Sequence, residues 1–572
     1  MIRQRLSQLA GDGLFSLTNE RVRLEMITKY LIIICSLGIV VILGFLSRRR
    51  GGRMTPEEYF LAGRRFGPLV LLATMAATNF SGFTIFGASG VGYRHGYSFF
   101  PVMGFGTGFM AIMFIFIGSK VWQRGKEKGH ITPAELMGDI YRSRSLATLF
   151  SLVMIVFTIP YIAIQPIAAG IALEKLLGIP YLWGATLITL FIVIYTITGG
   201  MRAIAWTDLF QGALMLIGMT LAFIVIVNAQ GGMITASHKL LEMKPELFSR
   251  PGPGGIYTPY IWMSWLILWM LCDPLFPQLF QRFYAARNTR SLSATMICYP
   301  AFSTIIFILP IMIGVLGHLA FPNLSKMESD NILTLLLDRY GGNFVGPLVI
   351  ACGLAAIMST MDSQLLTLSS IFVRDILPGS ARRATWYRLS GKVMVVILAL
   401  LGLIIAYQKF DTIFATATKY SFTGLAVLFP TLWGGLYWKR AHPAGAVLSI
   451  LIGEALVIVS YFGLLPDVKF LPVIPIVGIA GLVYIGVCLI VGKTSPAIHP
   501  RKMVRWSPRQ WLANGFLAVL FLLSLDFWQW RKALPLIGGL PYWVWYFFLL
   551  SALLTLVMVY LSKSLPEEGQ SG

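Results

Sequence analysis

Charged residues are scarce in this chain, and acidic residues are the scarcest of them. Only 12% of the 572 residues are Asp, Glu, Lys or Arg, whereas 56% are hydrophobic. A soluble domain carries about 25% charged residues, so this composition excludes a water-soluble protein and predicts a chain that crosses a membrane many times. The formal net charge of +22 does not indicate nucleic-acid binding, because Lys and Arg concentrate in short loops between apolar runs, as orientation signals do.

Motifs of several other protein classes are also missing. All five cysteines lie in apolar runs, without a Cys-x-x-Cys pair or the spacing of a disulfide framework or metal site. The first 25 residues lack the apolar core of a signal peptide. No His-Glu-x-x-His, Gly-x-Ser-x-Gly or paired Gly-Asp motif occurs, so we do not expect an enzyme. Only a short polar tail follows Leu561, which disfavours a sensor with an output domain.

About fifteen apolar segments, each on the order of 20 residues long, follow one another along the chain. They begin near Tyr30, Pro68, Phe99, Leu146, Tyr181, Leu209, Pro259, Ala294, Gly342, Val393, Thr412, Ala444, Phe470, Trp511 and Tyr542. Arginines within residues 48–65 follow the first segment, which predicts that this loop is cytoplasmic and the N-terminus outside.

Counting the loops alternately from there gives the orientation of the rest. The Lys- and Arg-rich loops fall inside as far as Arg509, including the loop that holds Arg282, Arg287 and Arg290. The loops at 230–258 and 326–330 fall outside. We therefore expect a multi-pass protein of the cell (inner) membrane with a cytoplasmic C-terminus.

Two of the segments are poor continuous helices. Residues 68–92 contain four glycines behind the polar run 78–81, and residues 259–283 contain Asp273, Pro274 and Pro277 in their middle. Glycine frays a helix, and proline removes a donor and clashes with the preceding turn. Each segment is followed by four more, so broken helices open two consecutive five-segment halves. This pattern favours an inverted-repeat transporter with a midplane site; two ordinary kinks are the alternative.

Polar side chains interrupt the apolar run at 353–375. One face of a helix there carries small and oxygen-bearing residues at three- and four-residue spacings: Ala356, Ser359, Thr360, Ser363, Thr367 and Ser370. Hydroxyls at membrane depth are unfavourable unless they face a cavity or a partner, so the stripe indicates a site. The alternative is close helix packing, with the hydroxyls bonding back to carbonyls.

Four pieces of the sequence, in this order, carry a resemblance to a known family. They are EEYFLAGRRFGP at 57–68, GGMRAIAWTDLFQG at 199–212, AAIMSTMDSQLLTLSS at 355–370 and FPTLWGGLYWKRAHPAGA at 429–446. From about Glu57 to Val491 the chain resembles the sodium/solute symporter family, which includes bacterial sodium-coupled proline, pantothenate and monocarboxylate permeases. The resemblance implies a secondary active symporter that imports a small organic solute with sodium by alternating access. A transporter-like sensor and a proton-coupled permease are the alternatives.

The resemblance also implies an all-α, leucine-transporter-type fold. It consists of two inverted five-helix repeats, one extra N-terminal helix and about four extra C-terminal helices. The expected divisions are a polar extension (1–28), a first transmembrane helix (29–47), a first repeat (66–228), a second, inverted repeat (259–438), two additional helices (442–492), two further helices (509–562) and a polar tail (563–572).

In relatives, sodium binds between the first and eighth core helices, and the matching positions here define the expected ion site. They are the backbone oxygens of Ala77, Phe80 and Ala356 and the hydroxyls of Ser359 and Thr360. Uncharged oxygens of this kind suit Na⁺, the expected coupling ion. Asp208 is expected near the inward ion exit, or as an N-cap of the segment beginning at Leu209.

The resemblance places the solute at Asn79, Ser81, Trp269, Asp273 and Pro277. Two of these positions depart from the proline symporter branch, which has Asp in place of Asn79 and Tyr in place of Asp273. A carboxylate at Asp273 can pair with a cationic group of the solute, bind a second cation or carry a proton, or it can cap the helix break. Asp362, Lys419, Glu454 and His318 are not assigned to the site.

Overall fold

A computed structural model describes residues 2–46, 55–377, 384–408, 411–466, 468–491 and 507–563, and the side chains of 2–22, 45 and 384–388 are outside this description. The described residues are 84% helical; in the described ranges the only strands, β1 (Leu536–Ile537) and β2 (Leu540–Pro541), form a small hairpin. The expected all-α class is therefore confirmed. The expected inside-loop cations Arg48, Arg49, Arg50, Arg53, Arg382, Arg383, Arg501, Lys502 and Arg505 lie outside the described residues.

Among the described residues, eleven helices are long and apolar enough to cross a membrane, and two bent helix pairs raise this number to thirteen. The sequence predicted about fifteen segments. One difference arises at α10 (Tyr181–Ala229), which has 49 residues and a left-handed residue, Gly200 (φ 68°), inside it. A helix of that length spans about 74 Å at 1.5 Å per residue, more than twice the ~30 Å hydrocarbon core, so α10 contains two of the expected segments.

The other difference is the segment expected near Thr412, which is divided into short pieces rather than one long helix. It consists of α18 (Ile413–Ala417), η11 (Thr418–Phe422), α19 (Thr423–Val427) and α20 (Phe429–Tyr437). None of these pieces reaches the length of a membrane-crossing helix by itself.

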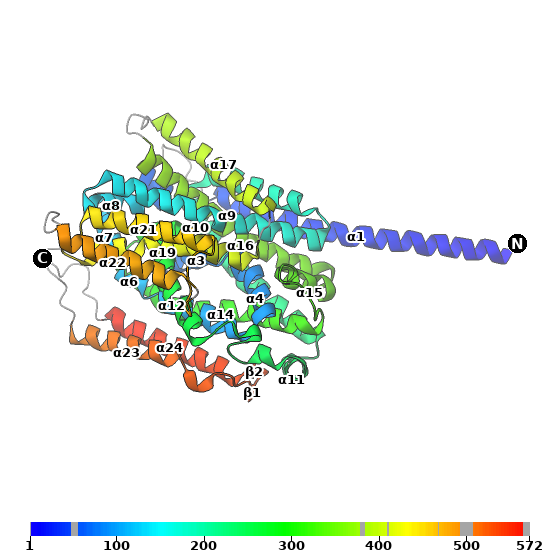
Figure 1. Cartoon of the computed structure of the whole chain (residues 1–572). Coiled ribbons are helices and arrows are strands. Elements are labelled where there is room, and N and C mark those ends of the chain that lie inside the picture. The colour runs from blue at the N-terminus through cyan, green and yellow to red at the C-terminus, as the bar shows by residue number, and fades with distance from the viewer. Residues whose placement is uncertain are drawn as a thin grey trace.

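The N-terminal helix α1 (Ile2–Leu46) is continuous over 45 residues. Its apolar part is Arg23–Gly44, so the expected division between a polar extension and a first span at residue 28 is not a break in the helix. Figure 1 shows the polar half of α1 projecting away from the helical body, while the apolar half lies against it. That half contacts α10 and α16 (Gly342–Ile371).

The first expected repeat opens with a broken helix. After α2 (Pro56–Leu61), α3 (Pro68–Asn79) ends and the segment Phe83–Phe99 continues at an angle of 60° to it. This segment comprises η1 (Phe83–Gly87), α4 (Ala88–His95) and η2 (Gly96–Phe99). The remaining elements are η3 (Pro101–Phe105), α5 (Gly106–Met110), α6 (Met113–Phe116), α7 (Gly118–Lys128), α8 (Pro133–Tyr141), α9 (Arg144–Leu177) and α10.

The second expected repeat opens in the same way. Here α12 (Pro259–Cys272) and η6 (Asp273–Leu275) meet α13 (Pro277–Ala285) at 57°. The two predicted helix breaks are thus confirmed, at matching places and with similar bends. The later elements are α14 (Thr289–Leu316), η7 (Gly317–Leu319), η8 (Glu328–Asn331), α15 (Ile332–Tyr340), α16, η9 (Phe372–Ile376), α17 (Ala384–Gln408) and α18 to α20.

The connection between the halves and the C-terminal region complete the chain. The connection contains α11 (Met233–Met243), η4 (Pro245–Phe248) and η5 (Pro253–Gly255). The C-terminal helices are α21 (Pro443–Tyr461), α22 (Val473–Val491), α23 (Pro508–Ser524), η12 (Phe527–Gln529) and α24 (Tyr542–Lys563). Of these, α24 packs on α14, η3 and α5.

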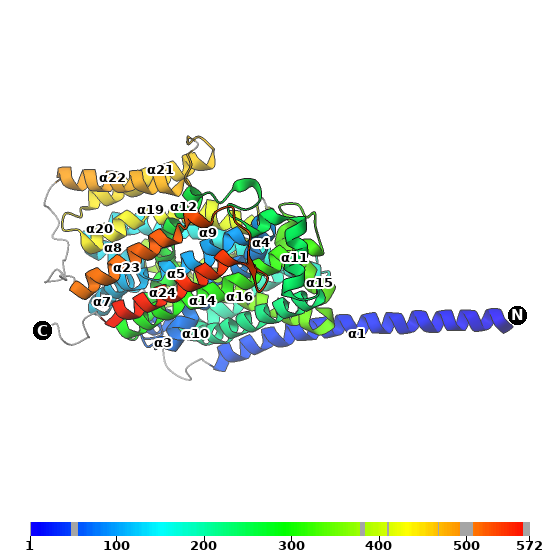
Figure 2. The same cartoon turned by 90° about the horizontal axis from the view of Figure 1, so that it is seen from below.

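Segments that the loop count assigns to one side of the membrane lie together in space. Figures 1 and 2 show α11 and α15 at the end of the body nearest the start of α1, and α7 and α8 at the opposite end. Long helices run between these two ends and separate the two groups of loops.

Candidate functional site

The break between α3 and η1 frees backbone oxygens in the middle of the fold. Phe80 leaves the helical conformation (φ −90°, ψ 96°), so the last carbonyls of α3 lack helical amide partners. Side chains of α16 reach two of them. Ser359 Oγ donates to the Ala77 carbonyl at 2.8 Å, and Thr360 Oγ1 donates to the Thr78 carbonyl at 3.1 Å. Ser359 Oγ also contacts the Ala356 carbonyl at 3.0 Å.

The structure therefore brings together four of the five residues expected to bind sodium. The oxygens of Ala77, Ala356 and Ser359 meet at hydrogen-bonding distance, with Thr360 beside them. The fifth, Phe80, ends α3, and its ring stacks on Phe302 at 5.5 Å between ring centroids. All five are buried.

The rest of the oxygen-bearing face of α16 bonds to the two broken helices. Ser363 Oγ lies 3.2 Å from Thr78 Oγ1 on α3. Thr367 Oγ1 donates to Gln281 Oε1 on α13 at 2.7 Å, and the Gln281 amide donates to Ser370 Oγ at 3.1 Å. The stripe is thus a polar contact surface facing both breaks, rather than a set of hydroxyls bonded only to their own helix.

Asp208 forms a buried ion pair beside these oxygens. Its carboxylate accepts from Arg282 Nη2 at 3.0 Å, from Thr74 Oγ1 and, at 3.4 Å, from Thr78 Oγ1. The side chains of Asp208 and Arg282 are both 0% exposed. Asp208 lies within a continuous helical stretch of α10, eight residues after the irregular Gly200, so the alternative that it is the N-cap of a helix beginning at Leu209 is wrong.

Arg282 is the residue that sequence reasoning misplaced. The loop count places it among the cytoplasmic loop cations, but it lies inside α13, fully buried. Besides Asp208, its guanidinium donates to Thr74 Oγ1 (2.9 Å), the Gln278 carbonyl (2.8 Å) and Ser363 Oγ (2.7 Å). The signal that could have found it is Asp208, because a carboxylate at membrane depth needs a cation or donors nearby.

Asp362 belongs to the same network and not to the oxygens expected to bind sodium. It accepts from Tyr195 Oη at 2.6 Å and from Ser363 Oγ at 3.1 Å. Ser363 thus connects the two carboxylates through Arg282. These contacts agree with leaving Asp362 out of the expected site.

A small cavity lies between the two helix breaks. Three of the five expected solute residues line it: Asn79, Trp269 and Asp273. The other lining residues are Phe83, Met103, Thr107, Tyr161, Phe276, Phe307 and Phe422. Ser81 and Pro277 are buried but do not line this cavity, and Ser81 Oγ instead accepts from Phe83 N at 3.1 Å.

The Asp273 side chain is not a cap of the helix break. The freed amide of Phe276 bonds to the Asp273 main-chain carbonyl at 3.1 Å. The Asp273 carboxylate instead accepts from Cys272 Sγ at 3.5 Å and contacts the Asn79 amide. The Asn79 amide also donates to Tyr299 Oη at 2.6 Å.

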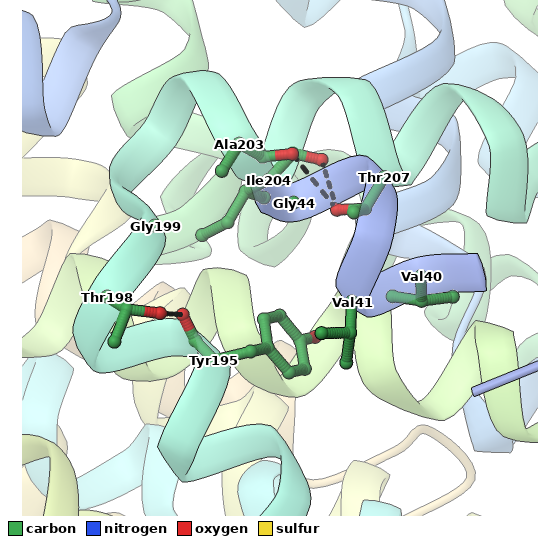
Figure 3. A pocket seen from close by; sticks show the side chains of 9 residues that line it. All are labelled: Val40, Val41, Gly44, Tyr195, Thr198, Gly199, Ala203, Ile204 and Thr207. Atoms are coloured by element: carbon green, nitrogen blue, oxygen red, sulfur yellow. Dashed lines mark hydrogen bonds between the residues drawn. The ribbon is translucent and has the colours of Figure 1, made fainter. Parts of the chain in front are cut away.

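A second pocket lies between α1 and the irregular part of α10, and Figure 3 shows its lining residues. The lining is mostly apolar and includes Val40, Val41 and Ile204. Its threonine hydroxyls bond within α10: Thr207 Oγ1 to the Ile204 carbonyl and Thr198 Oγ1 to the Tyr195 carbonyl, as the dashed lines in Figure 3 mark. With these groups already paired, we assign no solute to this pocket.

Comparison with known proteins agrees with the geometry. The sequence model of the sodium:solute symporter family matches residues 59–453. The sodium/pantothenate symporter of Haemophilus influenzae is 29% identical over 419 residues, which cover 72% of this chain and 85% of that protein. The high-affinity proline transporter PutP of Bacillus subtilis is 26% identical over 434 residues, covering 73% and 89%.

Solved structures show the same fold. A Na⁺-coupled sialic acid symporter aligns with a TM-score of 0.69 at 19% identity, over 82% of this chain and 99% of that one. Mhp1, a nucleobase-cation-symport-1 family transporter, aligns with a TM-score of 0.55 at 13% identity, over 78% and 97%. The expected leucine-transporter-type fold is confirmed. The family match covers more than half of the chain, and the chain therefore belongs to the sodium:solute symporter family.

Proposed function

We propose that this protein imports a small organic solute together with Na⁺, and that the ion binds to Ala77, Phe80, Ala356, Ser359 and Thr360. The observation that supports this most directly is the 2.8 Å contact between Ser359 Oγ on α16 and the Ala77 carbonyl at the break of α3. Sodium coordination requires several oxygens around one point, and carbonyl and hydroxyl oxygens from two helices approach one another here. One sodium ion moving down ~100 mV releases about 2.3 kcal/mol, enough for roughly 50-fold accumulation of solute.

The solute is proposed to bind in the cavity lined by Asn79, Trp269 and Asp273. These residues come from both broken helices, so relative movement of the two halves changes the cavity and opens it to one side or the other. Ser81 and Pro277, the other two expected solute residues, lie at the breaks: Ser81 Oγ accepts from Phe83 N, and Pro277 begins α13. This arrangement supports alternating access.

Asp208 is proposed to lie on the inward path of the ion. Thr78 links the two sites, because its carbonyl accepts from Thr360 and its hydroxyl contacts the Asp208 carboxylate. A sodium ion leaving its site therefore meets a carboxylate that Arg282 already neutralises. The arrangement favours release of the ion over its binding at a second tight site.

The orientation proposed from the loops has the N-terminus outside and the C-terminus in the cytoplasm of a cell membrane. The segregation of α11 and α15 from α7 and α8 fits the alternation of loops on which this orientation depends (Figure 2). The positive-inside rule then assigns the end with α7, which carries Lys120, Arg124 and Lys126, to the cytoplasm.

The test is uptake of labelled solutes into proteoliposomes with an imposed sodium gradient, a proton gradient or neither. Uptake that follows the sodium gradient supports the proposal. Uptake driven only by the proton gradient favours the proton-coupled alternative, and sodium binding without uptake of any solute favours the sensor. The Ser359 and Thr360 variants described below connect the result to the proposed ion site.

A further inference from the structure

The carboxylate of Asp273 faces the proposed solute cavity without a protein cation beside it. Asp273 is 1% exposed, and the polar groups around it are neutral: the Cys272 thiol, the Asn79 amide and the hydroxyls of Tyr161 and Tyr299. The ten residues that line the cavity include one acid and no Lys or Arg. A carboxylate buried in this way is unfavourable unless a cation or a proton joins it.

The arginine closest to Asp273 in the sequence beyond the break is already paired. Arg282 donates to Asp208 and Ser363, on the side of α13 that faces α3 and α16. It is therefore bound to a different carboxylate. A cationic partner for Asp273 would therefore have to enter the cavity with the solute.

Aromatic rings form most of the wall of this cavity. Six of the ten lining residues are aromatic: Phe83, Tyr161, Trp269, Phe276, Phe307 and Phe422. Several are in contact with one another, including Trp269 with Phe422 at 5.6 Å and Phe276 with Phe422 at 4.9 Å between ring centroids. The negative faces of such rings attract organic cations, and the attraction is strongest where water is excluded.

No Lys or Arg lines the cavity to receive a negatively charged group. A helix that begins at a break presents free amides, which bind carboxylates and phosphates. At η1 these amides are occupied, because Gly82 N donates to Gln165 Oε1 at 3.2 Å and Phe83 N donates to Ser81 Oγ at 3.1 Å. An anionic or zwitterionic solute would thus place its carboxylate near Asp273 without a cationic side chain to receive it.

We infer that the transported solute is a small organic monocation, with its ammonium group against Asp273 and its alkyl surface against Trp269 and the neighbouring rings. This inference rests on the proposed function, since it assumes that the cavity is the solute site. A protonated amine and a quaternary ammonium share this chemistry. They differ in that only the former donates hydrogen bonds to the carboxylate.

The experiment measures binding of radiolabelled ethanolamine and tetramethylammonium to the purified full-length protein, with and without Na⁺. Unlabelled tert-butanol, proline and pantothenate compete as neutral, zwitterionic and anionic solutes. At least one of the two cations should bind. Asp273→Asn should weaken its binding at least tenfold, whereas Asp273→Glu should retain part of it. Equal binding of both cations would indicate recognition by the rings and charge alone; preference for ethanolamine would indicate donated hydrogen bonds as well.

Glu454→Gln is the matched control for loss of a buried intramembrane carboxyl group. Glu454 lies on α21, outside the cavity, and its oxygens have no hydrogen-bond partner among the described residues. This variant should bind the two cations as the wild type does. The thermal midpoint of each variant shows whether the protein is folded.

The two proposals fail in different ways. The monocation inference is overturned if tert-butanol, proline or pantothenate competes at least as effectively as the unlabelled cations do. It is also overturned if folded Asp273→Asn binds the cations unchanged, or if neither cation binds the folded wild-type protein. Cation binding that requires Asp273 but is never coupled to Na⁺ leaves the inference standing and overturns sodium symport instead.

Discussion

The guanidinium of Arg250 donates to the carboxylate of Asp526, and both side chains are 0% exposed. The pair joins the loop after η4 to the turn between α23 and α24. Three rings of the C-terminal region surround the guanidinium: Trp530 and Trp543, each 4.8 Å away, and Phe547 at 5.4 Å. Arg531 N also donates to the Arg250 carbonyl at 2.7 Å.

The same loop packs closely on η2 of the first broken segment. A Cβ atom at Gly252 would lie 2.4 Å from Ser98 Oγ, and Gly252 has a φ of +81° that favours glycine. Trp543 Nε1 on α24 donates to the Phe248 carbonyl at 3.1 Å. The last two helices therefore hold this loop against the core, which gives a structural role to a region beyond the family match.

Replacing Asp526 by Ala should leave Arg250 buried without its counter-ion. The packing of this loop on the C-terminal helices should then be destabilised by about 3–5 kcal/mol. The effect should appear as faster amide hydrogen exchange in residues 245–257, with α9 and α16 unchanged. Asp526→Asn retains an acceptor and should have a smaller effect. Uniform loss of protection throughout the protein would contradict a local holding role.

Replacing both Ser359 and Thr360 by Ala removes two of the proposed sodium ligands while barely changing packing. The sodium concentration for half-maximal uptake should rise at least tenfold, because hydroxyl oxygens contribute directly to a site of uncharged ligands. Initial uptake rates measured over a sodium titration check this. Ser369→Ala is the control, since its hydroxyl bonds only to the Leu366 carbonyl of its own helix. Unchanged sodium dependence in the double variant would exclude this ion site.

Arg282→Gln should destabilise the protein by roughly 3–5 kcal/mol, because Asp208 then stays buried without a cation. The double variant with Asp208→Asn should recover part of this loss, as coupled residues do in a double-mutant cycle. Thermal unfolding midpoints in detergent provide the measurement. Lys326→Gln tests an ion pair with Asp411 in which Lys326 is 66% exposed, and it should cost no more than about 1 kcal/mol. If Arg282→Gln lowers the midpoint equally in the wild-type and in the Asp208→Asn background, the two residues are not coupled.

Single cysteines on a cysteine-free background test the orientation. Lys239→Cys on α11 should react with an impermeant maleimide in intact cells, whereas Gln123→Cys on α7 should react only after permeabilisation. Both positions are exposed in the structure. Reversed labelling would invert the proposed topology.

The sequence by itself determined the features that depend on neighbouring residues. Scarcity of charge and long apolar runs predicted a membrane protein, and glycine and proline marked both helix breaks, because each residue acts on its own turn of helix. The regular spacing of Ser359, Thr360 and Ser363 predicted one polar face, because α16 is regular there. Four motifs were specific enough to indicate the family.

Only the tertiary structure decided which of these residues meet. Trp269 and Asp273 share the cavity because they lie on one turn before the break, whereas Pro277 follows the 57° bend, where helical spacing no longer predicts direction. Arg282 ends an apolar run and so looked like a loop cation, but its partner Asp208 is 74 residues away in the chain. Arg250 and Asp526 are 276 residues apart. Such pairings depend on how helices pack, and no local pattern in the sequence records that.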